Sequence, residues 1–449
     1  MTKIITIRKG LDIKLKGEAE HIVATADVNR FAVKPTDFHG VLPRLLVAEG
    51  DRVLAGTPLF LDKNDDRILF TAPVSGTVTE VRRGARRLLE AIVISADTTP
   101  EYLQMQIPDL AAATAEEIID VLLKSGAWPF IRQRPYQVIA HPDHKPRAVF
   151  ISAFDSSPLA PDLDFLIGNR GNAFQVGVDV LKKISGAPVH LNIHAEQTSA
   201  PEFLKAAGVQ INRFKGPHPA GNVGIQIHHL DPVNKGEVVW TLNPLDVAMI
   251  GRLFLEKRFN TERVVALAGS EVMHPRYIRT HMGACVAEIT AGQVAGNNVR
   301  YISGNVLTGT RIAADGFLGF YDHLITVIPE GNHHEFLGWA KPGLKAFSFS
   351  NAFPSKLLHR KPFVPDTNLH GGERAFVVTG QYEKVLPMDI YPVQLLKAIL
   401  AKDIELMEDL GIYEVCEEDF ALCEVICTSK IEVQSILREG LDMVRQEMS

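Results

Sequence analysis

The chain has 449 residues, a formal net charge of −6, 46% hydrophobic residues and 22% charged residues. One hydrophobic core usually stops growing at about 250–300 residues, so this length predicts several domains. The acidic balance argues against a nucleic-acid partner, which would require a basic surface. The sequence also lacks a run of about 18 apolar residues that could span a bilayer.

The N-terminus is typical of a strand and not of a signal peptide. Polar and apolar residues alternate from Met1 to Gly10, without an unbroken apolar segment, and this pattern favours a cytoplasmic protein. The one basic cluster consists of Arg82, Arg83, Arg86 and Arg87. It is either a solvated turn or a contact with a partner or an anionic membrane surface.

Residues 1–97 are interpreted as an N-terminal segment followed by a small β domain. Two turn motifs, in residues 47–59 and 72–78, lie between β-branched runs and predict short strands. The pattern resembles the biotinyl/lipoyl-carrier hammerhead. Counting eight residues back from Pro73, to where such carriers hold the modified lysine, gives Asp65, and Lys63 is two residues out of register. We therefore expect a scaffold and not a carrier.

Residues 98–261 are predicted to form an α/β Rossmann-like domain. Thr114 and Glu117 have the spacing of a capping box, and Gly126 is the expected end of the helix that follows. Further along, strands alternate with helical patterns, which indicates a parallel sheet covered by helices. One of these helices is expected to begin at the cap pair Asn243 and Pro244. No G-x-G-x-x-G motif follows any of these strands. The glycine cluster at 168–171 is either a plain turn or the anion-holding start of a helix.

Short strands separated by glycine turns mark residues 262–345. Their order resembles a β-grasp module of the soluble-ligand-binding kind (SLBB-like). Residues 346–449 are interpreted as a linker and a C-terminal helical domain. One apolar helix face is expected there, formed by Leu395, Leu396, Ile399 and Leu400.

Metal binding is not expected. His190, Asn192 and His194 would share one face of a strand, but no third strong ligand accompanies the two imidazoles, and zinc generally requires three or four.

The cysteines do not have cluster-binding spacing. An iron–sulfur cluster needs four closely spaced thiolates, whereas Cys285 is far from Cys416, Cys423 and Cys427. Buried, unliganded thiols are expected. A remnant of a cluster-binding ancestor would explain their position equally well.

The succession of these units, from Ile4 to the C-terminus, resembles the NqrA family of the bacterial sodium-translocating NADH:quinone reductase. It is more distantly similar to the RnfC component of the Rnf complex and to the flavin-binding subunit of respiratory complex I. The segments 10–15 and 72–78 are the most specific part of the resemblance.

The resemblance implies a subunit without an electron carrier of its own. The flavin-binding relatives have a glycine-rich loop at the position of residues 125–134, because only glycine lets backbone amides approach the phosphate closely. Here Trp128, Pro129 and Phe130 occupy that loop. NADH, flavins and an iron–sulfur centre are thus expected on partner subunits.

The family role that follows is quinone binding, with electrons delivered by a neighbouring subunit and Na⁺ export performed by the whole complex. Aromatic rings suit a flat quinone, and fixed donors suit the oxygens that become negative on reduction. The quinone-binding residues expected on this basis are Trp128, Phe130, Arg132, Arg134, Phe38 and His39. From spacing alone, the same rings could equally pack into the core and the arginines could be solvated. His39 could supply a proton near neutral pH or be a plain loop histidine. No catalytic residue or metal ligand is assigned.

The expected location is peripheral, on the cytoplasmic side of the bacterial inner membrane, in contact with the other subunits of the complex and especially a membrane subunit. Two alternatives stay open. One is a flavin-dependent NADH dehydrogenase subunit. The other is a non-enzymatic adaptor whose β domains only join partners.

Overall fold

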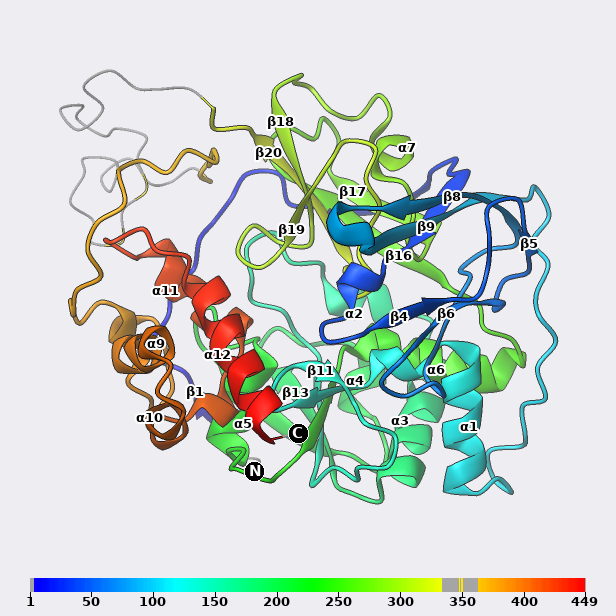
Figure 1. The fold of residues 1–449 in the computed structure, drawn as a ribbon, viewed down its shortest axis with the longest axis horizontal. Helices are drawn as coiled ribbons and strands as arrows, with labels where there is room; N and C mark the ends of the chain where they lie inside the picture. The colour runs from blue at the N-terminus through cyan, green and yellow to red at the C-terminus, as the bar shows by residue number, and fades with distance from the viewer. Residues whose placement is uncertain (1–3, 333–346, 348, 350–361, 449) are drawn as a thin grey trace.

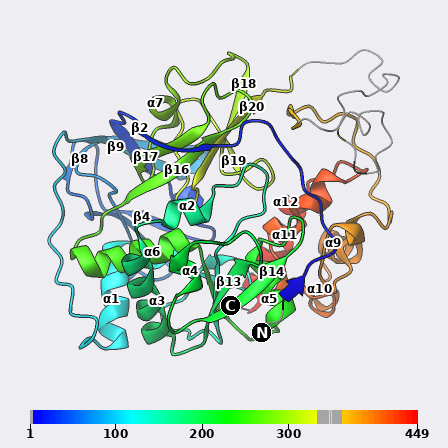
Figure 2. The same ribbon diagram turned by 180° about the vertical axis from the view of Figure 1, so that it is seen from behind.

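The computed structural model describes residues 4–332, 347, 349 and 362–448. Across these residues the chain builds four β-sheets and a group of C-terminal helices, arranged side by side (Figures 1 and 2). This architecture confirms the predicted α/β multidomain class. The boundary expected between residues 345 and 346 lies outside the described residues.

The α/β domain is organised around a seven-stranded sheet. Its strand order is β1 (Ile4–Thr6), β14 (Gln210–Lys215), β13 (Val189–His194), β12 (Val149–Ser152), β15 (Val239–Leu242), β10 (Arg132–Arg134) and β11 (Val138–Ile139). The first five strands are parallel, and β10 pairs antiparallel with both β15 and β11. The sheet is therefore mixed only at the edge that carries the loop after α1.

Helices cover both faces of this sheet. They are α1 (Ala115–Ser125), α2 (Leu163–Ile167), α3 (Gly171–Ser185), α4 (Pro201–Leu204), α5 (Val223–Leu230) and α6 (Pro244–Glu256). Successive side chains of β12 point to opposite faces: Val149 and Ile151 join the core that includes α3 and α6, whereas Phe150 packs with Ile227 of α5. The apolar run of the strand is explained by this burial on both sides.

The helix ends follow their sequence signals. Thr114 caps α1 with a complete capping box that includes Glu117, and Gly126 ends the helix in the left-handed conformation with φ 81°. Asn243 caps α6 by accepting a hydrogen bond from the backbone N–H of Leu245. Both predictions are confirmed. A capping side chain bonds backbone N–H groups within one helical turn of itself, so a cap can be predicted from the local sequence.

Helices α3 and α6 cross at two glycines. A Cβ atom on Gly251 would lie 1.8 Å from the backbone oxygen of Ala173, and one on Gly177 would lie 2.0 Å from that of Val247. Only glycine permits this approach, because the neighbouring atoms belong to backbone and cannot rotate away.

We expect Gly251→Ala to lower the free energy of unfolding by about 1–3 kcal/mol, the usual cost of overpacking a core. Helix propensity alone would give the opposite sign, since alanine is favoured over glycine in a helix interior by about 1 kcal/mol. Urea titration of the full chain measures the difference. Gly372→Ala is the matched control, because a Cβ atom there meets nothing within 4 Å. A stabilised Gly251→Ala variant would contradict the close crossing.

The SLBB-type module is a six-stranded sheet. Its order is β19 (Thr310–Ile312), β18 (Val299–Ser303), β20 (Leu324–Pro329), β16 (Glu262–Ala268), β17 (Arg276–His281) and β2 (Glu20–Thr25), with α7 (Val286–Thr290) beside it. Two small sheets form the N-terminal β domain: β3 (Arg30–Val33), β9 (Leu89–Ala96), β8 (Gly76–Arg83) and β5 (Arg52–Val53) in one, and β4 (Pro43–Leu45), β6 (Pro58–Asp62) and β7 (Leu69–Thr71) in the other. A short 3₁₀ turn lies at η1 (Pro35–Asp37), and η2 (Ala85–Arg87) is a tight turn that contains left-handed residues.

The first 25 residues contribute strands to two other units before the β domain begins. Strand β1 pairs with β14 of the α/β sheet, and β2 pairs with β17 of the SLBB-type sheet. The sequence predicted a strand near the N-terminus, but it carries no signal for these partners. These pairings tie the N-terminal segment to the rest of the chain.

The C-terminal helical region has its own core. It contains η5 (Tyr382–Lys384), α9 (Pro392–Ala401), α10 (Ile404–Asp409), η6 (Ile412–Glu414), α11 (Glu417–Val425) and α12 (Val433–Met448). Of the expected apolar face of α9, Leu395, Leu396 and Ile399 are buried, but Leu400 is exposed. Cys427 lies past the end of α11 and therefore does not share a helix face with Cys423.

Candidate functional site

The loop that follows α1 turns back into the core. A 3₁₀ turn, η3 (Trp128–Phe130), leads into β10. Trp128 is fully buried, with its ring 5.7 Å from that of Trp240 in an edge-to-face arrangement, and its indole N–H donates to the backbone oxygen of Ala140 at 2.8 Å. This hydrogen bond satisfies the polar end of a large apolar side chain. Trp128 thereby fixes the shape of the loop.

The two candidate groups, one near residue 38 and one near residue 130, meet at a third residue that the sequence analysis missed. The ring of Phe320 lies 4.7 Å from that of Phe38 and 4.9 Å from that of Phe130. Phe70 and Phe259 extend the contact to β7 and to the residues after α6. We call these five rings the aromatic junction. It joins the β domain, the α/β domain and the SLBB-type module.

Arg132 lies at the edge of this junction. Its guanidinium carbon is 4.6 Å from the ring centre of Tyr321, a cation–π distance. The Tyr321 hydroxyl donates to the backbone oxygen of Pro129 at 2.8 Å, and burial raises the pKa of Tyr321, so that it remains a neutral donor. Among the described residues, none accepts a hydrogen bond from the guanidinium of Arg132. Within that part of the chain its N–H groups have no acceptor, although its charge acts on the nearby carboxylate of Glu418.

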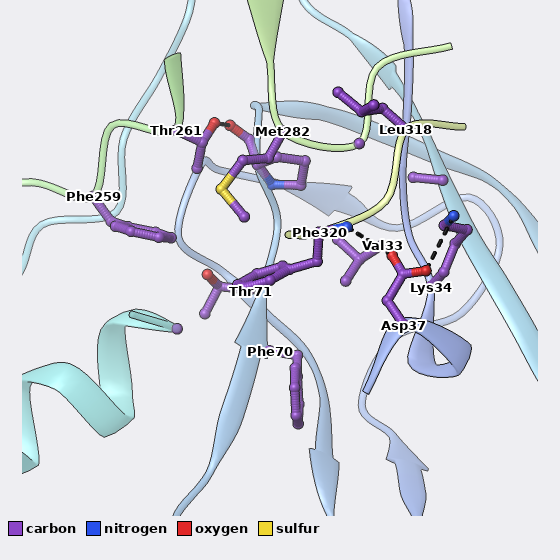
Figure 3. A pocket seen from close by; sticks show the side chains of 14 residues that line it. Val33, Lys34, Asp37, Phe70, Thr71, Phe259, Thr261, Met282, Leu318 and Phe320 are labelled. Carbon is purple, nitrogen blue, oxygen red and sulfur yellow. Dashed lines mark hydrogen bonds and ion pairs between the residues drawn. The ribbon is translucent and has the colours of Figure 1, made fainter. Parts of the chain in front are cut away.

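A small cavity of about 20 Å³ lies against the junction (Figure 3). Phe70, Phe259 and Phe320 supply part of its apolar wall. At one side the Lys34 ammonium lies 3.1 Å from Asp37, which accepts a hydrogen bond from the backbone N–H of Phe320 at 2.9 Å. Burial raises the pKa of Asp37. The cavity holds about one water molecule, so a larger ring could enter only if lining side chains moved.

Arg134 points to the C-terminal helices. Its guanidinium is 1% exposed and donates to Asp419 at 2.8 Å, to Glu418 at 2.6 Å and to the sulfur of Cys416 at 2.9 Å. Burial raises the pKa of Cys416, which caps α11 as a thiol. Cys416, Glu418 and Asp419 lie close enough to hold a metal ion. The positive charge at their centre is, however, the guanidinium of Arg134.

His39 contacts α12 of the C-terminal helical region. Its Nε2 atom is 2.7 Å from a carboxylate oxygen of Asp442, and both side chains are partly exposed. The structure therefore brings Phe38, Phe130 and Arg132 together at the junction. It places Trp128 in the α/β core, and Arg134 and His39 at two contacts with the C-terminal helices.

The remaining candidates have structural partners. His190 stacks on Phe150 and shares a hydrogen bond with Asn212, which also donates to Asn192. All four cysteines are buried and free. The glycine cluster leads into α3 without a side-chain cap.

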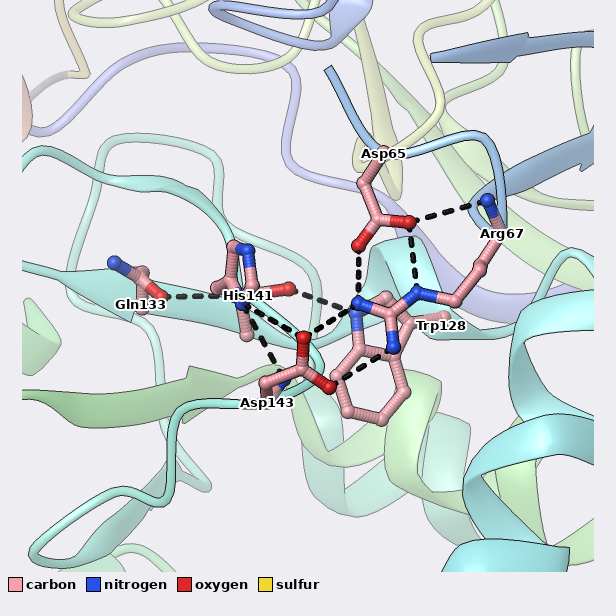
Figure 4. A network of polar contacts seen from close by, with 7 residues as sticks. Asp65, Arg67, Trp128, Gln133, His141 and Asp143 are labelled. Carbon is pink, nitrogen blue, oxygen red and sulfur yellow. Dashed lines mark hydrogen bonds and ion pairs between the residues drawn. The ribbon is translucent and has the colours of Figure 1, made fainter. Parts of the chain in front are cut away.

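The hairpin that replaces a carrier lysine is pinned to the α/β domain (Figure 4). Arg67 lies 2.6 Å from Asp65 and 2.7 Å from Asp143, and its hydrogen bonds lower the pKa of Asp65. Asp65, at the position expected for the modified lysine, thus holds Arg67 within the hairpin, and the second ion pair of Arg67, with Asp143, joins the two domains. A swinging arm would require a free hairpin tip instead.

Three domain models of one family match the chain. They are the NqrA N-terminal barrel-sandwich hybrid domain at residues 5–97, the NqrA second alpha/beta domain at residues 113–259 and the NQRA C-terminal domain at residues 264–314. Together with the helical region, these units define a multidomain α/β protein of the NqrA architecture.

Full-length relatives give the same result. The chain is 40% identical to the NqrA subunit of the Na⁺-translocating NADH-quinone reductase of Rhodopirellula baltica, over 99% of this chain and 98% of that protein. It is 41% identical to the corresponding subunit of Pseudomonas aeruginosa, over 99% of this chain and 100% of the relative. A solved NAD⁺-reducing [NiFe]-hydrogenase is similar only at 12% identity and a TM-score of 0.39, with 78% of this chain and 64% of that chain covered.

The chain belongs to the NqrA family of the Na⁺-translocating NADH-quinone reductase. The resemblance predicted from the sequence is confirmed, and with it the expectation of a subunit of an oxidoreductase complex. Within the described ranges, no helix is both long and apolar enough to cross a membrane.

Proposed function

We propose that this chain is a cofactor-free peripheral subunit that contributes to quinone binding, while the whole complex reduces quinone to quinol and exports Na⁺. The relatives are named as subunits of an NADH-quinone reductase. The observation that carries the assignment to this chain is the guanidinium of Arg132, which lies beside the aromatic junction and has no hydrogen-bond acceptor among the described residues. A flat ring can stack on phenyl groups, and a fixed cation can stabilise the oxygen that becomes negative on reduction.

The six candidate residues have different roles in this proposal. Phe38 and Phe130 contact the ring, and Arg132 donates to its oxygen. Trp128 and Arg134 hold the loop and β10 in place from two sides through their buried hydrogen bonds. His39 lies at the partly exposed contact between the β domain and Asp442 of α12.

The absence of a bound flavin is part of the proposal. Trp128, Pro129 and Phe130 are buried side by side in η3. They fill the space that a glycine-rich loop would leave for a cofactor phosphate. An absorbance spectrum of the purified chain tests this, because flavin bands would favour the alternative of a flavin-dependent dehydrogenase subunit.

The partners proposed are the other subunits of the complex, above all a membrane subunit, at the cytoplasmic side of the bacterial inner membrane. NADH, flavins and the iron–sulfur centre belong to those partners in this scheme. Co-purification of the chain with the membrane subunits, followed by accessibility labelling from each side of the membrane, tests the placement.

We expect Arg132→Gln to weaken binding of a short-chain quinone about 10-fold or more, since a hydrogen bond from a charged donor contributes about 1.5–3 kcal/mol. Equilibrium titration of the purified chain, alone and with the membrane subunits, measures this. Arg44→Gln is the charge-matched control, because Arg44 is an exposed arginine of β4 outside the junction. Unchanged binding in Arg132→Gln would remove this residue from the site. If the parent chain showed no saturable binding in either state, a non-enzymatic adaptor would be favoured.

A further inference from the structure

Strands β8 and β9 form a hairpin (Figure 1). Its turn contains a group of arginines that the proposed function does not use. Arg82 has a structural role: it forms two hydrogen bonds with Glu80 and lies over the ring of Phe317. Arg83 is exposed and donates to the backbone oxygen of Arg87 at 3.3 Å. Among the described residues, the side chains of Arg86 and Arg87 have no hydrogen-bond or ion-pair partner.

The backbone of this turn is costly for arginine. The backbone N–H of Leu88 donates to the oxygen of Ala85, and the two central residues, Arg86 and Arg87, have φ values of 54° and 61°. A hairpin turn with two left-handed residues strongly prefers Asn-Gly. Each non-glycine residue held there lowers stability. Folding alone therefore does not explain why arginines occupy both positions.

Leu88 completes the tip. It follows the arginines directly and is 53% exposed. The tip from Arg83 to Leu88 contains no acidic residue, although the chain as a whole carries a net charge of −6. The nearest acids along the hairpin are Glu80, which pairs with Arg82, and Glu90, which lies against Gly84.

We propose that this tip, residues 83–88, binds the anionic surface of a phospholipid membrane. Unpaired arginines beside an exposed leucine suit the boundary between headgroups and acyl chains, where the cations meet lipid phosphates and the leucine enters the apolar layer. An acidic protein partner would satisfy the arginines but would not require the leucine. The tip would add a lipid contact to whatever contacts hold the chain to its membrane partners.

The test is co-sedimentation of the purified full chain with phosphatidylcholine vesicles that either contain or lack phosphatidylglycerol. Binding is expected only with phosphatidylglycerol and is expected to weaken as salt is raised. The double variant Arg86→Asn/Arg87→Gly should bind about 30-fold less tightly, since each arginine near an anionic surface contributes about 1 kcal/mol. The same variant should melt at an equal or higher temperature, because Asn-Gly suits the turn.

The charge-matched control is Lys145→Asn/Lys205→Asn, which removes two exposed cations elsewhere and should leave vesicle binding unchanged. Leu88→Ser should also weaken binding. Equal sedimentation of the parent and Arg86→Asn/Arg87→Gly chains would overturn the proposal. So would loss of assembly with the membrane subunits while vesicle binding stays intact, because the tip would then contact protein. The quinone affinity of the same variants should be unchanged. A failure of the membrane proposal can therefore be distinguished from a failure of the proposed quinone-binding function.

Discussion

Replacing Arg134 by alanine is expected to lower the free energy of unfolding by about 3–5 kcal/mol, as for other buried ion pairs that lose one partner. Arg134 is 1% exposed and Asp419 is fully buried, and the two side chains are 2.8 Å apart. Without the guanidinium, the carboxylate of Asp419 would keep only its hydrogen bond from the backbone N–H of Cys416. The loss should be measured by urea titration of the full chain.

Hydrogen exchange should show where the loss acts. The Arg134 cluster joins β10 to the start of α11, and Arg438 of α12 adds a neighbouring link through Glu417 and the backbone oxygen of Tyr136. We expect amides of α11 to exchange faster in Arg134→Ala, while those of β16 in the SLBB-type sheet do not change. Arg132→Ala is the control, two residues away on the same strand, and should cost about 1 kcal/mol or less, the usual strength of a cation–π contact.

A double variant separates the charge from the packing. Arg134→Met/Asp419→Leu removes both charges and keeps apolar volume, and such replacements of buried pairs are often neutral or stabilising. It should therefore be more stable than Arg134→Ala. If Arg134→Ala were no less stable than Arg132→Ala, the buried pair would not hold the two regions together.

Local signals in the sequence predicted local structure well. The capping box of α1, its glycine stop and the Asn-Pro start of α6 all depend on residues within one turn of each other. They can therefore be predicted without knowledge of the fold. The carrier-like turns and the strand–helix alternation predicted the domain classes for the same reason. The sequence showed Asp65 at the position expected for a carrier lysine, but it did not show that Asp65 pairs with Arg67.

The candidate site depends on contacts between segments that are distant in the sequence, and these contacts could not be predicted from the sequence. Phe320 and Tyr321 bring the two candidate loops together from nearly 200 residues beyond the second loop, as shown by the hydrogen bond from Tyr321 to Pro129, separated by 192 positions. The pair of aromatics at 320 and 321 was the available signal. Arg134 was expected at a ligand, and its acidic partners lie more than 280 positions away. Sequence spacing carries no information about such pairs.

Phe130→Ala is expected to cost about 3–5 kcal/mol of folding free energy, the usual range for deleting a buried phenyl ring. Phe130 is 1% exposed and packs between Phe320, at 4.9 Å, and Phe259, at 6.3 Å. Its ring packs between the α/β domain and the SLBB-type module, so the lost dispersion energy cannot be recovered by local collapse of a single loop. Tyr391→Ala removes an aromatic ring that is 66% exposed and should change stability by less than about 0.5 kcal/mol.

Phe130→Leu distinguishes packing from ligand contact. Leucine keeps most of the apolar volume, so the variant should lose far less stability than Phe130→Ala, although it lacks a flat face. Under the proposed function, quinone affinity should still fall in Phe130→Leu while the thermal melt stays close to that of the parent. Normal quinone affinity in a folded Phe130→Leu chain would leave Phe130 as a packing residue only. Equal stability of the Phe130→Ala and Tyr391→Ala chains would show instead that the aromatic junction does not hold the domains together. Removal of a buried ring from such contacts should lower the free energy of unfolding.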